Sequence, residues 1–455
     1  ATYGIKSYIF ESLRPTPELS FAVRYLKCAG GIMITASHNP KEHNGYKVYD
    51  DTGCQLLPEA ADQVVQYVNE VEDELNIKVF SDEEAYPYMT WIGEEVDEAY
   101  YKEVMAIEVN PGMDKSDFKI VFSPQHGTSN IAVRTCLTRL GYDLVPVLAQ
   151  CAPDPDFSNT KSPNPEVPAS YELAIKKAKE VDADVVVITD PDGDRLGVVA
   201  KHNGEYVLMS GNQSAAVYLE YILSQMKEKG TLPDNAVMYN TIVTSDLGEL
   251  VARSYGVDVE KTLTGFKFIG DKIRKYEQTH EKTFVFGYEE SYGCVIKDFV
   301  RDKDAVQAVL TAAEAGNFYK KQGKDLVDVL NELYAKHGTF KETQIALSKA
   351  GAAGAARIKE IMDNLRKDAP QEIGGVKVVK VEDYGNSTCS DGTTIQLPKS
   401  NVLKYYLEDG SWIAARPSGT EPKCKFYFSI KGSDADDAAS KTEVFHKAMM
   451  EIIGE

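Results

Sequence analysis

Ser37 lies in a short turn directly after an apolar run. The turn, residues 35–40, reads Thr-Ala-Ser-His-Asn-Pro, and the apolar run covers residues 31–34. We expect this run to be a buried strand, which would put Ser37 at its carboxyl end, where open α/β sheets hold their chemistry. A hydroxyl held in this way can accept and donate a phosphoryl group. The alternative is an ordinary serine-rich turn, which is what a lone serine in a loop usually indicates.

Three aspartates at alternate positions follow a second candidate strand. Residues 184–189 form an apolar, β-branched run typical of a central parallel strand, and Asp190, Asp192 and Asp194 come directly after it. Like charges crowded at one strand end are tolerated when a hard cation such as Mg²⁺ neutralises them. The alternatives are a solvated acidic turn and a partial EF-hand loop. The twelfth position of such a loop, counted from Asp190, is Lys201 and not the glutamate that an EF-hand needs.

Residues 416–423 form a loop with an unusual density of hydrogen-bond donors. They contribute a guanidinium group, two hydroxyls, an accessible backbone and an ammonium group from Arg416, Ser418, Gly419, Thr420 and Lys423. Together these groups are suited to bind a phosphate through charge-assisted hydrogen bonds. A polar surface turn is the alternative, and the donor density favours phosphate binding.

Two further groups of polar residues precede residue 305. Glu289 and Ser291, just before a glycine, are suited to bind adjacent sugar hydroxyls, although a charged helix start is the alternative. Lys267, Arg301 and Lys303 form a basic set in an otherwise acidic protein. Lys303 has an aspartate on either side, so a surface ion-pair cluster is an equally good interpretation of that segment.

The composition limits the classes of partner. The chain has 455 residues and a net charge of -20, which argues against nucleic acid and anionic membranes as bulk partners. Its seven cysteines are scattered and odd in number, which is typical of reduced thiols in a cytoplasmic protein. No apolar run is long enough to span a bilayer, and no signal peptide is visible.

Strands and helices alternate along the chain, which is the signature of an α/β fold. In the first region we expect a strand at 5–10, a helix capped by Thr16 with Pro17 at its first position, and a hairpin around residues 51–53. The other expected helices cover residues 58–72, 93–107, 130–140, 169–180, 212–227, 303–320 and 353–366, with more starting near 245, 267 and 434. The other expected strands cover residues 118–123, 143–149, 236–243, 284–287, 376–380, 411–415 and 424–430, with a short one near 258.

The last helix shows a stripe of apolar side chains at i, i+3, i+4 and i+7: Phe445, Ala448, Met449 and Ile452. We expect this stripe to face the core of the C-terminal domain.

The four polar segments occur in the order of the α-D-phosphohexomutase family, which the chain resembles over nearly its whole length. The matching segments are residues 35–40 with Lys47, residues 190–195, residues 289–291 and residues 416–423. Residues 263–270, 287–293 and 301–304 resemble the larger phosphoglucomutase branch. The resemblance implies three similar mixed α/β domains and a C-terminal α+β domain around a central cleft. We expect the domains at 1–105 (phosphoserine), 106–209 (metal), 210–339 (sugar) and 340–455 (phosphate).

The resemblance also implies a role for each motif residue. Ser37 would be the phosphoserine and would bind one Mg²⁺ together with Asp190, Asp192 and Asp194. The other catalytic residues would be His38, Lys47, Arg195 and Lys303. The substrate would be bound by Lys267, Glu289, Ser291, Arg416, Ser418, Gly419, Thr420 and Lys423.

The implied reaction moves phosphate between positions 1 and 6 of a glucose phosphate. Phosphorylated Ser37 would give its phosphoryl group to the sugar, glucose 1,6-bisphosphate would turn over in the cleft, and Ser37 would recover the other phosphate. Lys47 or Lys303 would move protons. We expect a cytoplasmic monomer or weak homodimer that acts on a hexose phosphate and binds neither nucleic acid nor membrane. Mannose, pentose and amino-sugar phosphates stay open as substrates.

The chain departs from the family pattern in one respect. The family's first domain usually opens with a Gly-rich segment, a strand and a helix that are absent here, so we expect a smaller first sheet and a poorer catalyst.

Two rival functions stay open. Residues 185–194 also resemble the strand and Asp-x-Asp nucleophile of aspartyl-phosphate phosphatases, which would put the phosphate on Asp190. The other rival is a sugar-phosphate sensor without catalysis.

Overall fold

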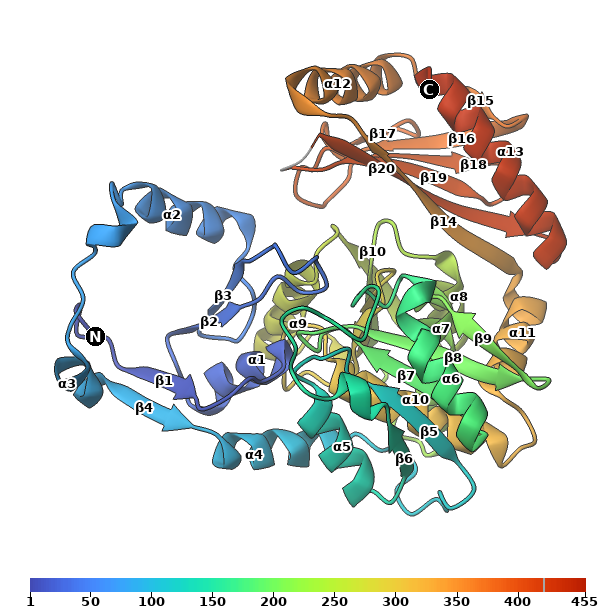
Figure 1. The fold of residues 1–455 in the computed structure, drawn as a ribbon. Coiled ribbons are helices and arrows are strands. Elements are labelled where there is room, and N and C mark those ends of the chain that lie inside the picture. The colour runs from blue at the N-terminus through green and yellow to red at the C-terminus, as the bar shows by residue number, and fades with distance from the viewer. Residues whose placement is uncertain (420–421) are drawn as a thin grey trace. The chain divides into compact units, whose positions relative to one another are not determined.

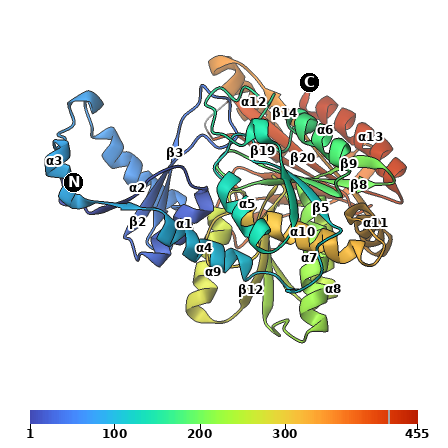
Figure 2. The same cartoon turned by 60° about the horizontal axis from the view of Figure 1, so that its bottom comes forward.

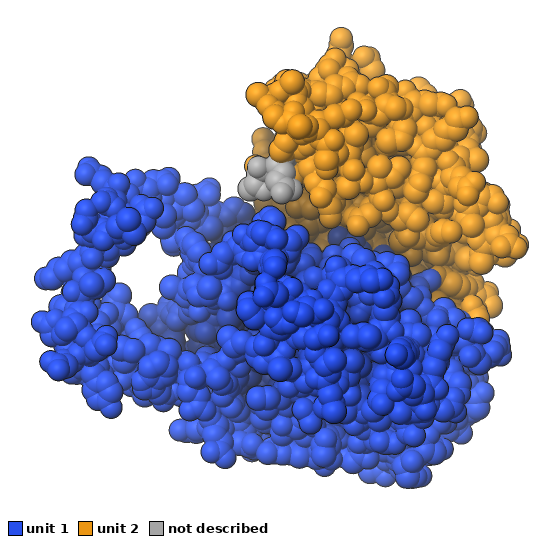
Figure 3. Space-filling view, viewed as in Figure 1, with its two compact units in different colours: residues 1–240, 255–260, 265–329 blue, residues 241–254, 261–264, 330–455 orange. Residues whose placement is uncertain are grey.

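The computed structural model describes residues 1–419 and 422–455. The chain divides into two compact units, shown in different colours in Figure 3. Unit 1 contains residues 1–240, 255–260 and 265–329, and unit 2 contains residues 241–254, 261–264 and 330–455. The four domain boundaries given above stay predictions.

The first region forms two separate strand pairs, β1 with β4 and β2 with β3 (Figure 1). The strands are β1 (Ser7–Phe10), β2 (Gly30–Ile34), β3 (Tyr46–Asp50) and β4 (Met89–Ile92), and the helices are α1 (Thr16–Tyr25), α2 (Pro58–Asn69), α3 (Asp82–Ala85) and α4 (Glu94–Met105). The expected smaller sheet is therefore observed. The expected burial of β2 is wrong: Ile32 and Ile34 are 63% and 68% exposed, because α1 packs on the other face of this strand pair.

The second region is a mixed sheet with strand order β6-β5-β7-β8-β9. The strands are β5 (Lys119–Ser123), β6 (Asp143–Pro146), β7 (Val185–Thr189), β8 (Leu196–His202) and β9 (Glu205–Met209), with helices α5 (Asn130–Arg139) and α6 (Glu172–Val181). Strand β7 is central and fully buried, as expected, and runs parallel to β5. It is antiparallel to β8, so the hairpin β8–β9, which the sequence analysis missed, makes the sheet mixed.

The third region contains a sheet with strand order β11-β10-β12-β13. Its strands are β10 (Ala236–Thr241), β11 (Asp258–Thr262), β12 (Thr283–Glu289) and β13 (Gly293–Val295), and its helices are α7 (Gly211–Glu228), α8 (Asp246–Ser254), α9 (Lys267–Thr279), α10 (Ala305–Lys320) and α11 (Leu326–His337). Helix α10 is buried almost all round and packs on α4, α5, α7 and the sheet of the second region (Figure 2). Asp304 caps it by accepting hydrogen bonds from the N–H groups of Val306 and Gln307.

The C-terminal region is an antiparallel sheet with strand order β14-β20-β19-β18-β16-β15, covered by two helices. The strands are β14 (Thr339–Ser348), β15 (Glu372–Ile373), β16 (Val376–Asp383), β17 (Thr388–Cys389), β18 (Leu403–Leu407), β19 (Trp412–Pro417) and β20 (Lys423–Gly432), and the helices are α12 (Gly351–Lys367) and α13 (Ala435–Ile453). The predicted stripe of α13 is confirmed at Phe445, Ala448 and Met449. It is wrong at Ile452, which is 41% exposed because Ile453 takes the core position.

Among the described residues, no helix combines the length and apolar character needed to cross a membrane.

Candidate active site

The aspartate turn connects β7 to β8 and holds three buried carboxylates. Asp190, Asp192 and Asp194 are at most 4% exposed, and each offers an oxygen within 4.8 Å of the other two. Gly193 has a φ of 71°, which suits a glycine and turns the chain back sharply. The N–H groups of Asp194 and Arg195 both donate to Oδ1 of Asp190 at 3.0 Å, so the backbone itself fixes this carboxylate.

Part of this negative charge accepts no hydrogen bond from the described residues. Oδ1 of Asp192 and Oδ1 of Asp194 are buried without a hydrogen-bond donor, and the only ion pair of either oxygen within the described part of the chain is the 3.8 Å contact of Asp194 with Nε of Arg195. Burial and the charges of Asp192 and Asp194 raise the pKa of Asp190 well above its usual value. Buried carboxylate oxygens without partners are costly, and a bound divalent cation would remove that cost. The donor set therefore fits a hard cation.

Ser37 lies beside this carboxylate cluster. It has a φ of 54°, which a non-glycine residue adopts only when its surroundings impose it. Its N–H donates to Oγ1 of Thr35 at 2.8 Å, and its own hydroxyl donates to Oδ2 of Asp190 at 3.3 Å. The fold thus brings Ser37 and Asp190, 153 residues apart in sequence, into contact, and the Ser37 hydroxyl points toward the candidate metal site.

His38 also contacts the Ser37 hydroxyl, with Nδ1 3.1 Å from Oγ. Burial, followed by the nearby Arg195 charge, lowers the pKa of His38 to about 4. The imidazole is therefore neutral at neutral pH and can exchange a hydrogen bond with the serine.

Two lysines from different parts of the chain converge on Asp194. Nζ of Lys47, on β3, is 3.0 Å from Oδ2 of Asp192 and 2.9 Å from Oδ2 of Asp194. Nζ of Lys303, on the loop before α10, is 3.1 Å from the same Asp194 oxygen. Lys303 also lies 3.3 Å from Oδ1 of Asp302, so the expected ion pair is present, but at 11% exposure it is not at the surface.

The carboxylates and the lysines shift each other's pKa. Burial opposes the charged form of Asp194, but the charges of Lys303, Lys47 and Arg195 outweigh it and lower the pKa of Asp194. Burial likewise works against charged Lys47 and Lys303, and the carboxylates still raise the pKa of both lysines. Both amines are therefore protonated at neutral pH.

Arg195 lies next to the cluster without sharing the closest contacts. Its Nη1 is 2.7 Å from Oε1 of Glu166, and its Nε is 3.8 Å from Oδ1 of Asp194. Glu166 was not foreseen, because it lies in the Pro-rich linker before α6, where sequence alone gives no partner.

The predicted sugar-binding turn lies close to Lys303. Glu289 is buried at the end of β12, and its Oε1 accepts a hydrogen bond from the N–H of Gly265 at 2.7 Å. Gly293, just after the turn that holds Ser291, lies against Lys303: a Cβ at this glycine would be 2.0 Å from Cδ of the lysine. Lys267 begins α9, with Nζ 5.8 Å from the Phe268 ring centre.

The predicted phosphate loop belongs to unit 2 and connects β19 to β20. The N–H of Ser418 donates to the carbonyl of Lys423 at 2.7 Å, and Nη1 of Arg416 is 3.4 Å from the Tyr427 hydroxyl. A Cβ at Gly419 would meet no atom of the described residues within 4 Å. Thr420, also predicted to bind phosphate, lies outside the described residues.

Two threonines that the sequence analysis did not assign to the site donate to Asp192. Oγ1 of Thr16 and Oγ1 of Thr35 lie 3.2 Å and 3.3 Å from Oδ2 of Asp192. Thr16 is therefore not the predicted cap of α1: Pro15 occupies the N-cap position, without a side-chain hydrogen bond. The contact spans 176 residues, so no local sequence pattern could have shown it.

Comparison with known proteins gives a consistent assignment along the chain. The four domain models described as phosphoglucomutase/phosphomannomutase match in order: domain I at residues 1–75, domain II at 98–204, domain III at 210–337 and the C-terminal domain at 355–447. The expected four-domain α/β architecture is thereby confirmed.

Individual relatives agree with these domain matches. The phosphoglucomutase of Staphylococcus epidermidis is 39% identical over 449 residues, which are 97% of this chain and 81% of the relative. That of Staphylococcus aureus is 39% identical over 448 residues, or 97% and 80% of the two chains. The open form of parafusin, a phosphoglucomutase from Paramecium, has the same fold, with a TM-score of 0.70, 19% identity and coverage of 99% and 84%. The chain belongs to the phosphoglucomutase/phosphomannomutase family.

Proposed function

We propose that this protein is a phosphoglucomutase, which moves phosphate reversibly between positions 1 and 6 of glucose phosphate through phosphorylated Ser37. The observation that carries the proposal is the hydroxyl of Ser37, which donates to Asp190 at 3.3 Å. The neighbouring carboxylates of Asp192 and Asp194 pair with the protonated amines of Lys47 and Lys303. The identity of 39% with enzymes named phosphoglucomutase favours glucose over mannose or pentose phosphates.

We assign the cation site to Asp190, Asp192 and Asp194, with the phosphate on Ser37 as a further ligand. When bound there, Mg²⁺ would neutralise charge on the phosphoryl group and on the carboxylates. The buried oxygens of Asp192 and Asp194 that accept no hydrogen bond support this assignment. Thr16 and Thr35 orient Asp192 by donating to its other oxygen.

The protein's own residues would position the group and move protons. Protonated Lys47 and Lys303 are suited to stabilise the oxygens of the transferring phosphoryl group and to return a proton to the Ser37 oxygen as the O–P bond breaks. Neutral His38, 3.1 Å from that oxygen, orients it. Arg195, which Glu166 holds in place, adds positive charge next to Asp194.

The sugar and its second phosphate would be held by the remaining predicted residues. We assign the sugar hydroxyls to Glu289 and Ser291, with Lys267 nearby, and the phosphate that does not react to the loop of Arg416, Ser418, Gly419, Thr420 and Lys423. After the first transfer, glucose 1,6-bisphosphate would reorient so that its other phosphate meets Ser37. Phosphomannomutase or phosphopentomutase activity is the alternative within the family.

The test compares Ser37→Ala with Ser387→Ala. Ser387 also has a positive φ, 56°, so the control carries the same backbone strain at a loop outside the site. We expect Ser37→Ala to lose turnover of glucose 1-phosphate in a coupled assay while both variants keep the wild-type melting temperature. We also expect intact-mass spectrometry to show a phosphoryl group that survives mild acid after incubation with glucose 1,6-bisphosphate, absent from Ser37→Ala.

Other outcomes would redirect the assignment. An acid- and alkali-labile phosphoryl group that survives Ser37→Ala would indicate an aspartyl phosphate on Asp190. Faster turnover of mannose, ribose or N-acetylglucosamine 1-phosphate in the same assay would replace glucose as the substrate. Ligand binding without exchange of label between positions would indicate a sensor.

A further inference from the structure

Asp302 joins the two segments that carry the catalytic lysines. Its Oδ2 accepts a hydrogen bond from the Tyr49 hydroxyl at 2.6 Å, and Tyr49 is two residues after Lys47 on β3. Its Oδ1 accepts from the backbone N–H of Lys303 at 2.8 Å and lies 3.3 Å from Nζ of the same lysine. One carboxylate thus contacts the strand of one lysine and both the backbone and the amine of the other.

This contact is buried and geometrically demanding. Tyr49 is 1% exposed and Asp302 is 2% exposed, so water does not replace the hydrogen bond between them. On a strand, residues two apart face the same side, so the side chains of Tyr49 and Lys47 leave β3 in the same direction. A shift of the Tyr49 ring away from Asp302 would therefore move the Lys47 amine relative to Asp192 and Asp194.

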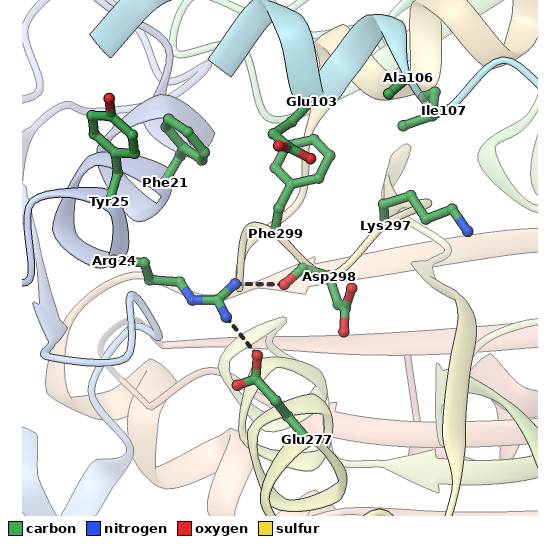
Figure 4. Close-up of a pocket in the computed structure, with 10 residues that line it drawn as sticks. All are labelled: Phe21, Arg24, Tyr25, Glu103, Ala106, Ile107, Glu277, Lys297, Asp298 and Phe299. Atoms are coloured by element: carbon green, nitrogen blue, oxygen red, sulfur yellow. Dashed lines mark hydrogen bonds and ion pairs between the residues drawn. The ribbon is translucent and has the colours of Figure 1, made fainter. Parts of the chain in front are cut away.

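A second set of hydrogen bonds and ion pairs joins α1 to the loop before Lys303. Arg24, on α1, donates to the Asp298 carbonyl and to Oε1 of Glu277, both at 2.6 Å (Figure 4). Glu277 also pairs with Arg301 at 2.5 Å, and the N–H of Arg301 donates to Oγ of Ser20 at 2.9 Å. These bonds hold α1 to the loop before Lys303. Arg24, Glu277 and Asp298 also line a cavity of about 640 Å³.

We propose that the hydrogen bond between Tyr49 and Asp302 is a positioning contact that holds Lys47 and Lys303 together against Asp194. Arg24, Glu277 and Arg301 hold α1, which packs against β2 beside β3, to the loop before Lys303. Loss of the hydrogen bond between Tyr49 and Asp302 therefore displaces the amines and leaves the fold assembled. The expected effect on turnover rests on the proposed function. The expected shift of the lysine amines does not depend on that function, so the shift and the turnover can be tested separately.

The first variant is Tyr49→Phe, which removes one hydroxyl and keeps the ring. Its matched control is Tyr100→Phe, because Tyr100 is equally buried and donates at 2.9 Å to Asp304, two residues further along the same loop. Both variants lose a buried tyrosine–aspartate hydrogen bond, so both should show a similar fall in melting temperature.

The direct readout is the reactivity of the amines. Each protein, without sugar phosphate, is treated briefly with an acylating reagent, and the modified lysines are quantified by mass spectrometry. We expect Lys47 and Lys303 to react several times faster in Tyr49→Phe than in the wild type and Tyr100→Phe, with Lys359 on α12 as the internal reference. Unchanged reactivity of both lysines in Tyr49→Phe would overturn the proposal, whatever the activity.

The second readout is the split between kcat and KM for glucose 1-phosphate. Small displacements of catalytic groups cost on the order of tenfold to a hundredfold in rate. We expect Tyr49→Phe to lose kcat in this range with KM within about twofold of the wild type. Equal losses in Tyr49→Phe and Tyr100→Phe would show a purely structural role and contradict the proposal. If no variant turns over any sugar phosphate, the proposed function fails and the labelling result still decides the inference.

Discussion

Lysines at different buried positions of this protein have their pKa values shifted in opposite directions. Carboxylates within 3.1 Å keep Lys47 and Lys303 charged. Lys404, in unit 2, is also fully buried, but its Nζ donates to the Ile242 carbonyl at 2.8 Å and lies 3.8 Å from the Trp412 ring centre. Burial, and then the charge of Lys261, lower the pKa of Lys404 to about 7. Carboxylates in direct contact outweigh burial at Lys47 and Lys303, whereas burial and the charge of Lys261 prevail at Lys404.

Lys404 should make the stability of unit 2 depend on pH. In the unfolded chain a lysine titrates near pH 10.4, so between about pH 7 and 10 the unfolded state binds the extra proton. Stability from this group is therefore present at high pH and is lost as the pH falls towards 7, by at most about 1.4 kcal/mol per pH unit. We expect the free energy of urea unfolding of the wild type, minus that of Lys404→Met, to rise over this range. A difference that stays flat from pH 7 to pH 10 would contradict the lowered pKa.

Sequence restricts single residues most where the residue types and their neighbours limit the chemistry. Asp190, Asp192 and Asp194 stand at alternate positions of one turn, so the crowding of their carboxylates, which the structure shows, is visible in the sequence. Thr16 could not be recognised, because its hydrogen bond to Asp192 depends on how distant segments pack. Local rules favoured a helix cap for this threonine, and the tertiary contact took precedence.

Elements with a strong periodic or apolar pattern were the easiest to predict. The continuous β-branched run of β7 and the helical stripe of α13 appear where the sequence places them, with Ile452 as the exception. The hairpin β8–β9, the short strand β13, helix α11 and the edge strand β14 were missed. Strand β13 has three residues, β14 is half-exposed, and β8 directly follows the aspartate motif, so their strand patterns are weak. Helix α11 does have a buried apolar face, at Leu326, Val329, Leu330 and Leu333, and its helical spacing could have revealed it. The prediction that β2 is buried was wrong, because burial depends on packing partners that the sequence of the strand does not specify.

Helix α10 offers a test of packing at the level of elements. Gly316 lies inside the helix, where alanine would normally gain about 1 kcal/mol in helix propensity. A Cβ at this position would, however, be 2.5 Å from Cζ of Phe118, just before β5. We expect Gly316→Ala to lower the free energy of unfolding by about 1–3 kcal/mol, because overpacking outweighs propensity.

The control for this test is the double variant Gly316→Ala with Phe118→Leu. A smaller side chain at 118 removes the clash, so the double variant should be more stable than the sum of the single effects predicts. Urea unfolding of the four proteins in the cycle gives the coupling energy. A Gly316→Ala variant as stable as the wild type would show that α10 and β5 can separate at no cost.

The molecule as a whole should not unfold in one step. The C-terminal core, which includes Ile413, Phe426 and Met449, lies entirely in unit 2, and the core around Val186 lies entirely in unit 1. Units with cores of their own can open separately, so a single two-state transition is not expected.

A pair of core variants tests this independence. Phe426→Ala should cost about 3–5 kcal/mol within unit 2, because it leaves a cavity under α12 and α13. We expect hydrogen–deuterium exchange, followed by mass spectrometry, to accelerate in peptides from residues 330–455 and to stay unchanged in β5 and β7. Val186→Ala should give the reverse pattern. Equal acceleration of exchange in both units by either variant would show one cooperative structure instead.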